Sequence, residues 1–293
     1  ALPASEKLLT EHGLEFEIAP TQYPWHAVEL TREAAQEGCE VVVAVGGDGT
    51  VNEVINGLMA AKQEVGHPPA LGVVGVGRGN DFAHGVGIPA GLEAACRVLT
   101  ADRRRMIDVG RVSGGLFPQG RFFGNCVGVG FDAIGTIEAA KLPRLGGFLS
   151  FFVAVLKTIF LYYRAPVTRV DYDDRTLSQP SLMVSIMNGQ RLGGGFLMAP
   201  EAEPDDGLFD LCIAAQMSRI RILRLIPHFL KGTQATQKEI TAGRAARITI
   251  TALEGALPAQ TDGEILCVDG ERLEIELLPR QIEVVFQAAE GVL

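Results

Sequence analysis

Cysteine pairs and a surplus of basic residues are both absent from this sequence. The five cysteines lie far apart and no two form a C-x-x-C pair, so neither a disulfide framework nor a zinc site is indicated, and a reducing cytoplasm fits this usage. Lysine and arginine number 26 against 35 aspartate and glutamate, which gives a formal net charge of -9. Because phosphate backbones are bound by basic surfaces, this charge disfavours nucleic acid as a partner.

Long hydrophobic runs are also scarce, and one stretch, residues 146–163, is apolar enough to be considered as a membrane span. Lys157 lies inside it, and a lysine at the centre of a spanning helix costs about 2.5–3.5 kcal/mol on insertion scales. Val155 and Ile159 fall close to one helical face together with several aromatic residues. The pattern predicts a half-buried helix of a globular domain.

The chain has 293 residues, of which 47% are hydrophobic, and is long enough to bury two ordinary cores. Residues 6–100 alternate helical segments with apolar, strand-like ones. The expected strands are residues 14–20, 40–45 and 70–76. This alternation predicts a parallel sheet covered by helices on both faces. Ligands of such sheets bind just beyond the carboxyl ends of the strands, where this chain has two glycine-rich turns.

The character of the chain changes after Asp108. Apart from the helix at 146–163 and a second near 218–231, short runs rich in Val, Ile, Leu and Phe alternate with turn pairs. The turn pairs are Asn188-Gly189, Asp206-Gly207, Asp262-Gly263 and Asp269-Gly270. We therefore expect an α/β domain over residues 1–107 and an antiparallel β domain over residues 108–293, whose last residues could return to the first domain.

The first glycine-rich turn is GGDGT, residues 46–50, between an apolar strand and a helical segment. Its glycines let backbone N–H groups approach an anion, and the following helix offers unpaired amides and the positive end of its dipole. A phosphate-bearing ligand is expected there. Asp48 would be unfavourable beside phosphates unless a cation or a proton intervenes, so we expect it to handle magnesium or a substrate hydroxyl.

Two further features bear on this turn. Residues 50–53 match a capping box, which would fix the start of the helix. The spacing does not fit the Walker loop, which needs G-x-x-x-x-G-K followed by Ser or Thr. An ordinary strand-to-helix turn capped by Asp48 is the alternative.

The second turn, GVGRGNDF at residues 75–82, repeats the arrangement of glycines followed by Asn80 and Asp81. Two such turns could hold a nucleotide from opposite sides, and one tight turn capped by Asn80 is the alternative. A third segment, GVGFDA at residues 128–133, satisfies the dinucleotide fingerprint. It lacks the acidic residue roughly 20 positions later that would hold a ribose, so a nicotinamide-dependent dehydrogenase is disfavoured.

These motifs resemble the diacylglycerol kinase catalytic family of lipid kinases, which also holds sphingosine and ceramide kinases. The matching segments cover nearly the whole chain and are GGDGTVNEVINGL (46–58), GRGNDFA (77–83), NGQRLGGGFLMAPEAEPDDGLFDL (188–211) and TDGEIL (261–266). The resemblance implies ATP-dependent transfer of the γ-phosphoryl group to a lipid hydroxyl. It also implies a phosphofructokinase-like α/β domain, an antiparallel β-sandwich domain and a nucleotide in the cleft between them.

The resemblance implies roles for individual residues as well. The nucleotide would be held by the two glycine-rich turns and one upstream threonine, namely Thr21, Gly46, Gly47, Asp48, Gly49, Thr50, Asn52, Arg78, Asn80 and Asp81. Glu264 of the D-G-E segment would take the proton of the lipid hydroxyl, with Asp48 as the alternative base. Glu264 is preferred to Glu271 because the second D-G-E triplet lies too close to the last expected strand.

A magnesium ion that orders the second domain is implied at the D-G-L segment. Its ligands would be Glu203, Asp206 and Leu208. Asp205 and Asp210 lie close by in the sequence, and clustered carboxylates in loops suit hard cations. A solvent-exposed turn is the alternative explanation of these aspartates.

Two departures from the family pattern matter. The family begins with a strand that ends in N-P-x-S-G, which is not found here, so we expect the first strand to be missing. Arg78 stands where the family usually has threonine, and it could pair with phosphate or fill the site. A nucleotide- or lipid-binding pseudokinase therefore stays open, as does a soluble-substrate kinase of the NAD kinase or phosphofructokinase type.

The expected enzyme uses ATP and Mg²⁺ and works in the cytoplasm at the inner face of the membrane, where its lipid substrate lies; a homodimer is allowed. Residues 219–231 form a helical pattern with basic and apolar sides. These residues are Arg221, Arg224, His228 and Lys231 on one side and Ile222, Leu223, Ile226 and Leu230 on the other. Such a helix can rest on an anionic bilayer. The alternative is that its apolar side packs on the β domain.

Overall fold

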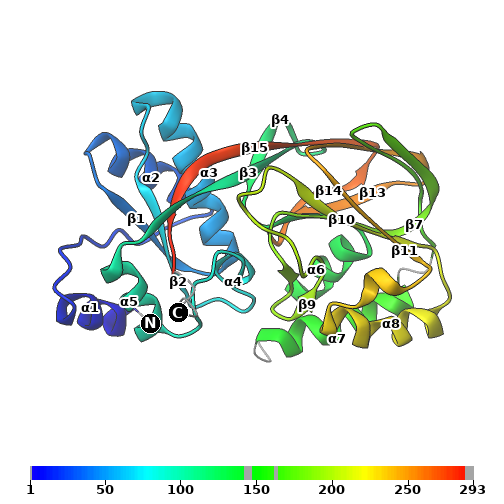
Figure 1. The fold of residues 1–293 in the computed structure, drawn as a ribbon, viewed down its shortest axis with the longest axis horizontal. Helices are drawn as coiled ribbons and strands as arrows, with labels where there is room; N and C mark the ends of the chain where they lie inside the picture. Colours follow the sequence, from blue (N-terminus) through cyan, green and yellow to red (C-terminus); the bar gives the residue numbers. More distant parts are fainter. Residues whose placement is uncertain (1, 142–146, 162–163, 288–293) are drawn as a thin grey trace, which may run out of the picture.

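In the computed structural model, which describes residues 2–141, 147–161 and 164–287, the chain forms two lobes that lie side by side (Figure 1). The first lobe alternates helices with strands. Its elements are α1 (Leu2–Glu11), α2 (His26–Gln36), β1 (Val41–Gly46), α3 (Asp48–Val65), β2 (Ala70–Gly75), α4 (Asp81–Gly85) and α5 (Leu92–Ala101). Strands β1 and β2 pair in parallel, in register from Val41 opposite Ala70 to Gly46 opposite Gly75. Their carboxyl ends therefore lie at one edge, as expected.

Two local predictions in this lobe are wrong. Residues 14–20 form no strand, because only Leu14 packs against the core whereas Phe16 is exposed. The capping box also fails, since α3 already begins at Asp48 with Gly47 as its N-cap. Glu53 instead accepts a hydrogen bond from the Ala27 N–H, at 3.2 Å.

The second lobe is a β-sandwich with three helices against one of its sheets. Its elements are β3 (Arg104–Gly114), β4 (Phe117–Phe123), β5 (Cys126–Gly130), α6 (Phe131–Lys141), α7 (Gly147–Leu161), β6 (Val167–Tyr172), β7 (Arg175–Met187), β8 (Arg191–Leu192), β9 (Phe196–Leu197), β10 (Phe209–Ala215), α8 (Arg219–Lys231), the 3-10 turn η1 (Gln234–Thr236), β11 (Ile240–Ala245), β12 (Arg247–Glu254), β13 (Leu257–Thr261), β14 (Glu264–Gly270) and β15 (Arg272–Val285). Apart from the β15–β2 contact, the pairings of these strands are antiparallel.

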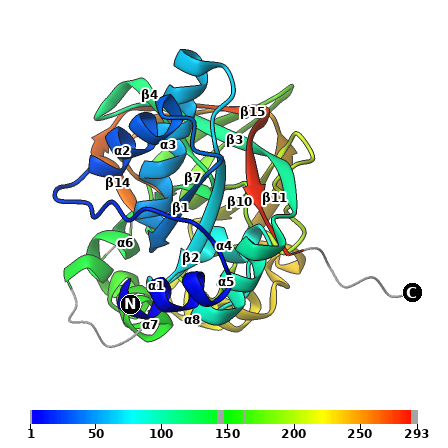
Figure 2. The same cartoon turned by 90° about the vertical axis from the view of Figure 1, so that its left-hand side faces the viewer.

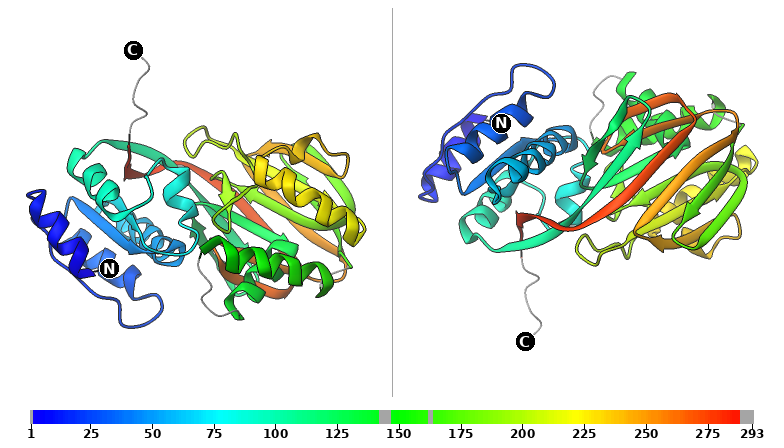
Figure 3. Two further views of the ribbon diagram at one scale, coloured as in Figure 1. Left: turned by 90° about the horizontal axis from the view of Figure 1, so that it is seen from below. Right: turned by 90° about the horizontal axis from the view of Figure 1, so that it is seen from above.

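Strand β7 forms the corner of the sandwich. Its first half pairs with β6, and its second half pairs with β5 and β10. One apolar core fills the space between the sheets, and a second lies under α7 and α8. Seen from below, these two helices run across one face of the sandwich (Figure 3).

A two-stranded ribbon of β3 and β15 connects the lobes. The strands pair from Glu274 opposite Ser113 to Val285 opposite Arg104, and Val284 also pairs with Leu71 of β2. Figure 2, which looks onto the first lobe, shows the end of β15 beside the strands of that lobe. The last described strand thus completes the first sheet.

Helix α7 accounts for most of the apolar stretch at 146–163; residues 146, 162 and 163 lie outside the described part. Val155 and Ile159 are buried under the sandwich, and Lys157 pairs with Glu138 of α6. The half-buried helix is confirmed. None of the described helices is both long enough and apolar enough to cross a bilayer.

Candidate functional site

The two glycine-rich turns touch each other at the carboxyl ends of β1 and β2. The Val76 N–H donates to the Gly46 carbonyl oxygen at 3.0 Å. A Cβ built on Gly77 would lie 2.4 Å from the Cα of Gly47, closer than two carbon atoms can pack. Because neither backbone could approach the other so closely past a side chain, glycine is required at this contact.

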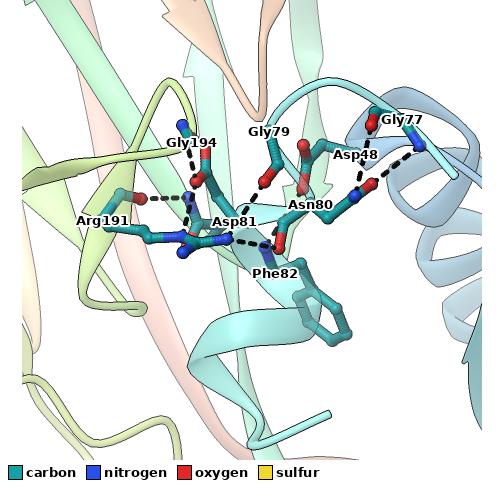
Figure 4. A network of polar contacts seen from close by, with 9 residues as sticks. Asp48, Gly77, Gly79, Asn80, Asp81, Phe82, Arg191 and Gly194 are labelled. Carbon is teal, nitrogen blue, oxygen red and sulfur yellow. Dashed lines mark hydrogen bonds and ion pairs between the residues drawn. The ribbon is translucent and has the colours of Figure 1, made fainter. Parts of the chain in front are cut away.

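The second turn is held in shape by its own asparagine. Asn80 has a left-handed backbone with φ of 50°. Its side-chain oxygen accepts the Gly77 N–H at 2.9 Å, and its side-chain nitrogen donates to the Gly77 carbonyl oxygen at 3.2 Å (Figure 4). The side chain of Asn80 is thus used within the turn, as the simpler interpretation of this motif proposed. Arg78 is exposed at its tip.

Two carboxylates, those of Asp48 and Asp81, lie on either side of Gly79. A Cβ built on Gly79 would be 2.9 Å from the Oδ2 atom of each. Oδ1 of Asp48 accepts the Phe82 N–H at 3.1 Å. Burial raises the pKa of both groups, and the charge of Asp48 is the second cause that brings the pKa of Asp81 to about 7. A cation bound here would relieve this repulsion.

A polar cleft of about 480 Å³ lies at the first turn of α3. Its lining comes from both lobes and consists of Thr21, Gln22, Tyr23, Pro24, Trp25, Gly49, Glu53, Arg121 and Glu264. Glu264 is directed at the start of the helix, since a Cβ on Gly49 would lie 3.2 Å from its Oε1. The guanidinium of Arg121 lies over the ring of Trp25, 4.4 Å from the ring centre. The cleft thus combines a carboxylate, an arginine and an aromatic surface.

Asp262 connects the D-G-E turn to both lobes. Its Oδ1 accepts the N–H groups of Asn125 and Cys126 at 3.0 and 2.8 Å, and its Oδ2 accepts the Gly124 N–H and the Asn52 side-chain nitrogen, both at 2.9 Å. The sequence suggested only a hairpin turn at Asp262. The turn does form, between β13 and β14, but the carboxylate is buried and fixes the position of Glu264 two residues later.

Asn52 lies fully buried at the same boundary between the lobes. Its side-chain oxygen accepts from Nε and Nη2 of Arg121, at 3.1 and 2.7 Å, and its nitrogen also donates to the Phe122 carbonyl oxygen at 3.0 Å. These contacts occupy the side chain within the protein. A direct nucleotide contact by Asn52 stays a prediction.

The D-G-L loop lies apart from these groups, against Asp108. The Gly207 N–H donates to Oδ2 of Asp108 at 2.8 Å, and the guanidinium of Arg244 contacts the carboxylates of Asp206 and Asp210. Asp205 lies 3.9 Å from Arg105. In the described part of the chain, no three His, Cys, Asp or Glu side chains are grouped to hold a metal. Arg244 therefore supplies the positive charge beside Asp206.

The predicted residues accordingly fall into three places. Thr21, Gly49 and Glu264 line the cleft, whereas Glu271 lies at the other end of β14. At the touching turns are Gly46, Gly47, Asp48, Thr50, Asn80 and Asp81. The proposed metal ligands, Glu203, Asp206 and Leu208, lie on the D-G-L loop.

Sequence reasoning missed an apolar cavity of about 70 Å³ between the three helices and the sandwich. Its lining residues come from seven elements and the loops beside them and are Phe131, Asp132, Gly135, Val155, Leu182, Met183, Leu192, Phe196, Met198, Ala214, Met217, Ile222, Leu225, Ile226 and Phe229. Asp132 is the single charged residue in this lining. It accepts a hydrogen bond from the Ser185 hydroxyl, and burial raises the pKa of Asp132 to about 7.

Comparison with known proteins bears on both lobes. Residues 1–112 match the family described as the diacylglycerol kinase catalytic domain, and residues 125–286 match the YegS C-terminal NAD kinase beta sandwich-like domain. A solved structure of a diacylglycerol kinase from Bacillus anthracis str. Sterne has a TM-score of 0.73 at 22% identity, over 99% of this chain and 93% of that chain. The predicted fold class, an α/β domain followed by a β-sandwich, is confirmed.

Relatives with higher sequence identity carry kinase names. The chain is 32% identical over 256 residues, 87% of its length and 79% of the relative, to a protein of Chromohalobacter salexigens named "Probable lipid kinase YegS-like". It is 30% identical over 256 residues, 86% of its length and 80% of the relative, to the diacylglycerol kinase of Bacillus subtilis. The chain belongs to the diacylglycerol kinase catalytic family and is a lipid kinase.

Proposed function

We propose that this enzyme transfers the γ-phosphoryl group of ATP to the hydroxyl of a neutral lipid, diacylglycerol or a close relative. One observation carries the proposal. The chain places two touching glycine-rich turns and a polar cleft at the boundary between its lobes, and an apolar cavity in the sandwich. Phosphoryl transfer needs an anion-binding site, and a lipid acceptor needs an apolar one.

The first turn would bind the nucleotide phosphates. The N–H groups of Gly47, Gly49 and Thr50 lie at the start of α3, where unpaired amides and the helix dipole favour anions. Thr21 and Trp25 line the same cleft and would contact the nucleoside end.

Glu264 would take the proton from the lipid hydroxyl as that oxygen attacks the γ-phosphorus. It lies beside Gly49 at the start of α3, next to the proposed phosphate position. Asp48 is the alternative base. Its pKa is raised, first by burial, and a raised pKa makes a carboxylate a stronger base.

Magnesium, when bound with ATP, supplies charge neutralisation for the transferring phosphoryl group. The neighbouring carboxylates of Asp48 and Asp81 fit a divalent cation, because burial raises the pKa of both groups and the charge of Asp48 raises the pKa of Asp81 further. At the D-G-L loop the fit is poorer, since a cation at Asp206 would have to displace the guanidinium of Arg244.

The lipid would enter the apolar cavity from the membrane surface. Helices α7 and α8 cover the cavity with Val155, Ile222 and Leu225. Their outer sides expose large apolar residues and basic ones, namely Leu149, Phe160, Ile220, Leu223, Arg224, Leu230 and Lys231. We expect this face, called the α7–α8 face below, to rest on the anionic inner surface of the cytoplasmic membrane.

Two details of the expected membrane helix change. Of the expected apolar side, Ile222 is buried and Ile226 packs against the core of the second lobe, as the alternative held, whereas Leu223 and Leu230 are exposed. Arg221 is held by Glu239 at 2.7 Å, so Arg224 and Lys231 are the basic residues most available to lipid.

Transfer of labelled phosphate from ATP tests the function. The protein is incubated with micelles of diacylglycerol, monoacylglycerol, ceramide, sphingosine or phosphatidylglycerol, and separately with soluble acceptors such as nicotinamide dinucleotide and hexose phosphates. The proposal expects a labelled product with a neutral glycerolipid. Transfer only to a soluble acceptor, or ATP binding without any transfer even after Arg78→Thr, would contradict it.

A further inference from the structure

The β8–β9 hairpin, residues 191–197, contacts both proposed substrate regions. On one side, Leu192 and Phe196 line the apolar cavity. On the other side, Arg191 and Gly194 contact the second glycine-rich turn of the first lobe (Figure 4). The hairpin is thus a direct connection between the place proposed for the lipid and the turn proposed for the nucleotide.

Arg191 makes several contacts with that turn. Its Nε lies 3.0 Å from Oδ1 of Asp81, and its Nη2 donates to the carbonyl oxygens of Gly79 at 3.1 Å and Asn80 at 3.3 Å. The Gly194 N–H adds hydrogen bonds to both oxygens of Asp81, at 2.9 and 3.2 Å. A planar guanidinium can serve a carboxylate and two carbonyls at once, whereas a lysine ammonium cannot reproduce this fork.

The same turn holds Asp48. The Phe82 N–H, one residue after Asp81, donates to Oδ1 of Asp48 at 3.1 Å. Gly79, whose carbonyl Arg191 contacts, lies between the two carboxylates. A shift of the turn would therefore move the hydrogen bond that orients Asp48.

The position of the second glycine-rich turn depends on the ion pair between Arg191 and Asp81. Asp81 is 7% exposed and lies beside a second carboxylate, so Arg191 provides its main favourable charge contact. Removing one partner of a buried ion pair leaves the other charge unsatisfied. Without Arg191, Asp81 and the turn would have to rearrange.

We propose that Arg191 is a positioning residue that couples lipid in the apolar cavity to the nucleotide turn, and so to the orientation of Asp48. This inference rests on the proposed function, because it assigns the cavity to lipid and the turns to ATP. Lipid that packs against Leu192 and Phe196 would favour the hairpin position in which Arg191 and Gly194 hold Asp81. Binding of one substrate would then strengthen binding of the other, since coupling between two sites is reciprocal.

Calorimetry of wild type and variants tests the coupling. A non-hydrolysable ATP analogue is titrated with and without dioctanoylglycerol micelles. In the wild type, lipid should tighten analogue binding by at least ~5-fold, the lower end of usual couplings. In Arg191→Met the factor should fall to nearly one while either ligand alone still binds, and Arg191→Lys should be intermediate. Arg272→Met, which removes an exposed arginine paired with Glu274, should behave as wild type.

Two further measurements keep the test decisive. Leu192→Ala changes the cavity side of the hairpin without touching Asp81, so it should also reduce the coupling, and it replaces Arg191→Met if that variant does not fold. In steady-state assays, Arg191→Met should lose the decrease in KM for ATP that lipid causes. The inference would be overturned if lipid did not tighten analogue binding in the wild type, or if it tightened binding in Arg191→Met as much as in the wild type. A failure of the proposed function would be seen separately in the phosphate-transfer assay, because the wild-type protein would then make no phosphorylated lipid.

Discussion

The polar cleft and the apolar cavity are lined by side chains of opposite character. The cleft lies at the boundary between the lobes and is lined by groups such as Thr21, Arg121 and Glu264. The cavity lies inside the second lobe, and of its lining only Asp132 carries a charge within the described residues. We infer that the chemistry and the recognition of the lipid are separated, and that the β8–β9 hairpin, which contacts the cavity and the second glycine-rich turn, connects the two regions.

The two regions also differ in how firmly they are held. At the polar side, Asp262 accepts four hydrogen bonds and Asn52 is fully buried between the lobes. At the apolar side, the cover consists of helices α7 and α8 that pack on the sandwich through side chains. Movement that admits a lipid is therefore expected in the helices, and the groups for phosphoryl transfer should stay in place.

Removing the proposed base should produce the largest effect. Glu264→Gln or Asp48→Asn should lower kcat by ~10²–10⁴-fold, because a general base contributes about that much. Lipid binding should not change, since neither residue lines the apolar cavity. The measurement is phosphate transfer with lipid binding in parallel. Glu271→Gln, which changes the exposed glutamate of the second D-G-E triplet, is the matched control. Near-normal turnover in both Glu264→Gln and Asp48→Asn would remove these assignments.

Charge reversal on the α7–α8 face should weaken contact with the bilayer. Arg224→Glu with Lys231→Glu should lower sedimentation with anionic vesicles by roughly tenfold or more at low salt, because each basic residue near the surface contributes about 1 kcal/mol. Added salt should shrink the difference. The control is Arg169→Glu with Arg272→Glu, which reverses two exposed arginines on β6 and β15. An equal loss of vesicle binding in both double variants would show that the contact with the bilayer does not lie on α7 and α8.

Filling the cavity should weaken lipid binding without changing how the nucleotide site itself binds ATP. Gly135 lines the cavity, and a Cβ built there meets no other atom within 4 Å. Gly135→Leu should raise the KM for lipid by about tenfold, the effect of one or more methylenes in an apolar pocket, with the KM for ATP unchanged when it is measured at saturating lipid. Gly135→Ala should show a smaller change. Because replacing a helical glycine by alanine adds stability, about 0.5–1 kcal/mol, unfolding would not explain a loss in Gly135→Ala, and a urea unfolding curve checks Gly135→Leu for overpacking. An equal change in both KM values would contradict the separation.

The smallest effect expected is on stability and comes from Asp132. Its folded pKa of about 7 lies above the usual value, so the folded protein holds a proton that the unfolded chain has released. Stability contributed by this group is therefore lost as pH rises toward and through 7. Asp132→Asn cannot ionise, and its advantage over wild type in free energy of unfolding should grow by about 1 kcal/mol or more from pH 5 to pH 8. Urea unfolding at both pH values measures this, and a constant difference would contradict it.

The polar cleft and the glycine-rich turns could be predicted from the sequence because their residues occur in short motifs. Two glycine-rich turns after apolar strands predicted where Gly46, Asp48 and Asp81 would meet. The resemblance placed Glu264 at the cleft. Motifs did not show that Thr50 lies inside α3 or that Arg244 occupies the D-G-L aspartates, since both depend on contacts between residues distant in the chain.

The apolar cavity could not be predicted in this way. Its lining is drawn from segments between Phe131 and Phe229, and each apolar residue there resembles an ordinary core residue. The helices at 146–163 and 218–231 were predicted by periodicity, but which side of each faces a cavity is decided by packing on the sandwich. Arg191 was likewise hidden, because its partner Asp81 lies 110 residues away in the sequence.

Amide hydrogen exchange of the wild-type protein, with a non-hydrolysable ATP analogue or with dioctanoylglycerol, tests the separation of the two regions most directly. The analogue alone should slow exchange at the first glycine-rich turn and at the start of α3. The lipid alone should slow exchange in α6 and α8, which line the cavity. Lipid that protects neither α6 nor α8, or an analogue that protects these helices and leaves the glycine-rich turns unchanged, would contradict the account.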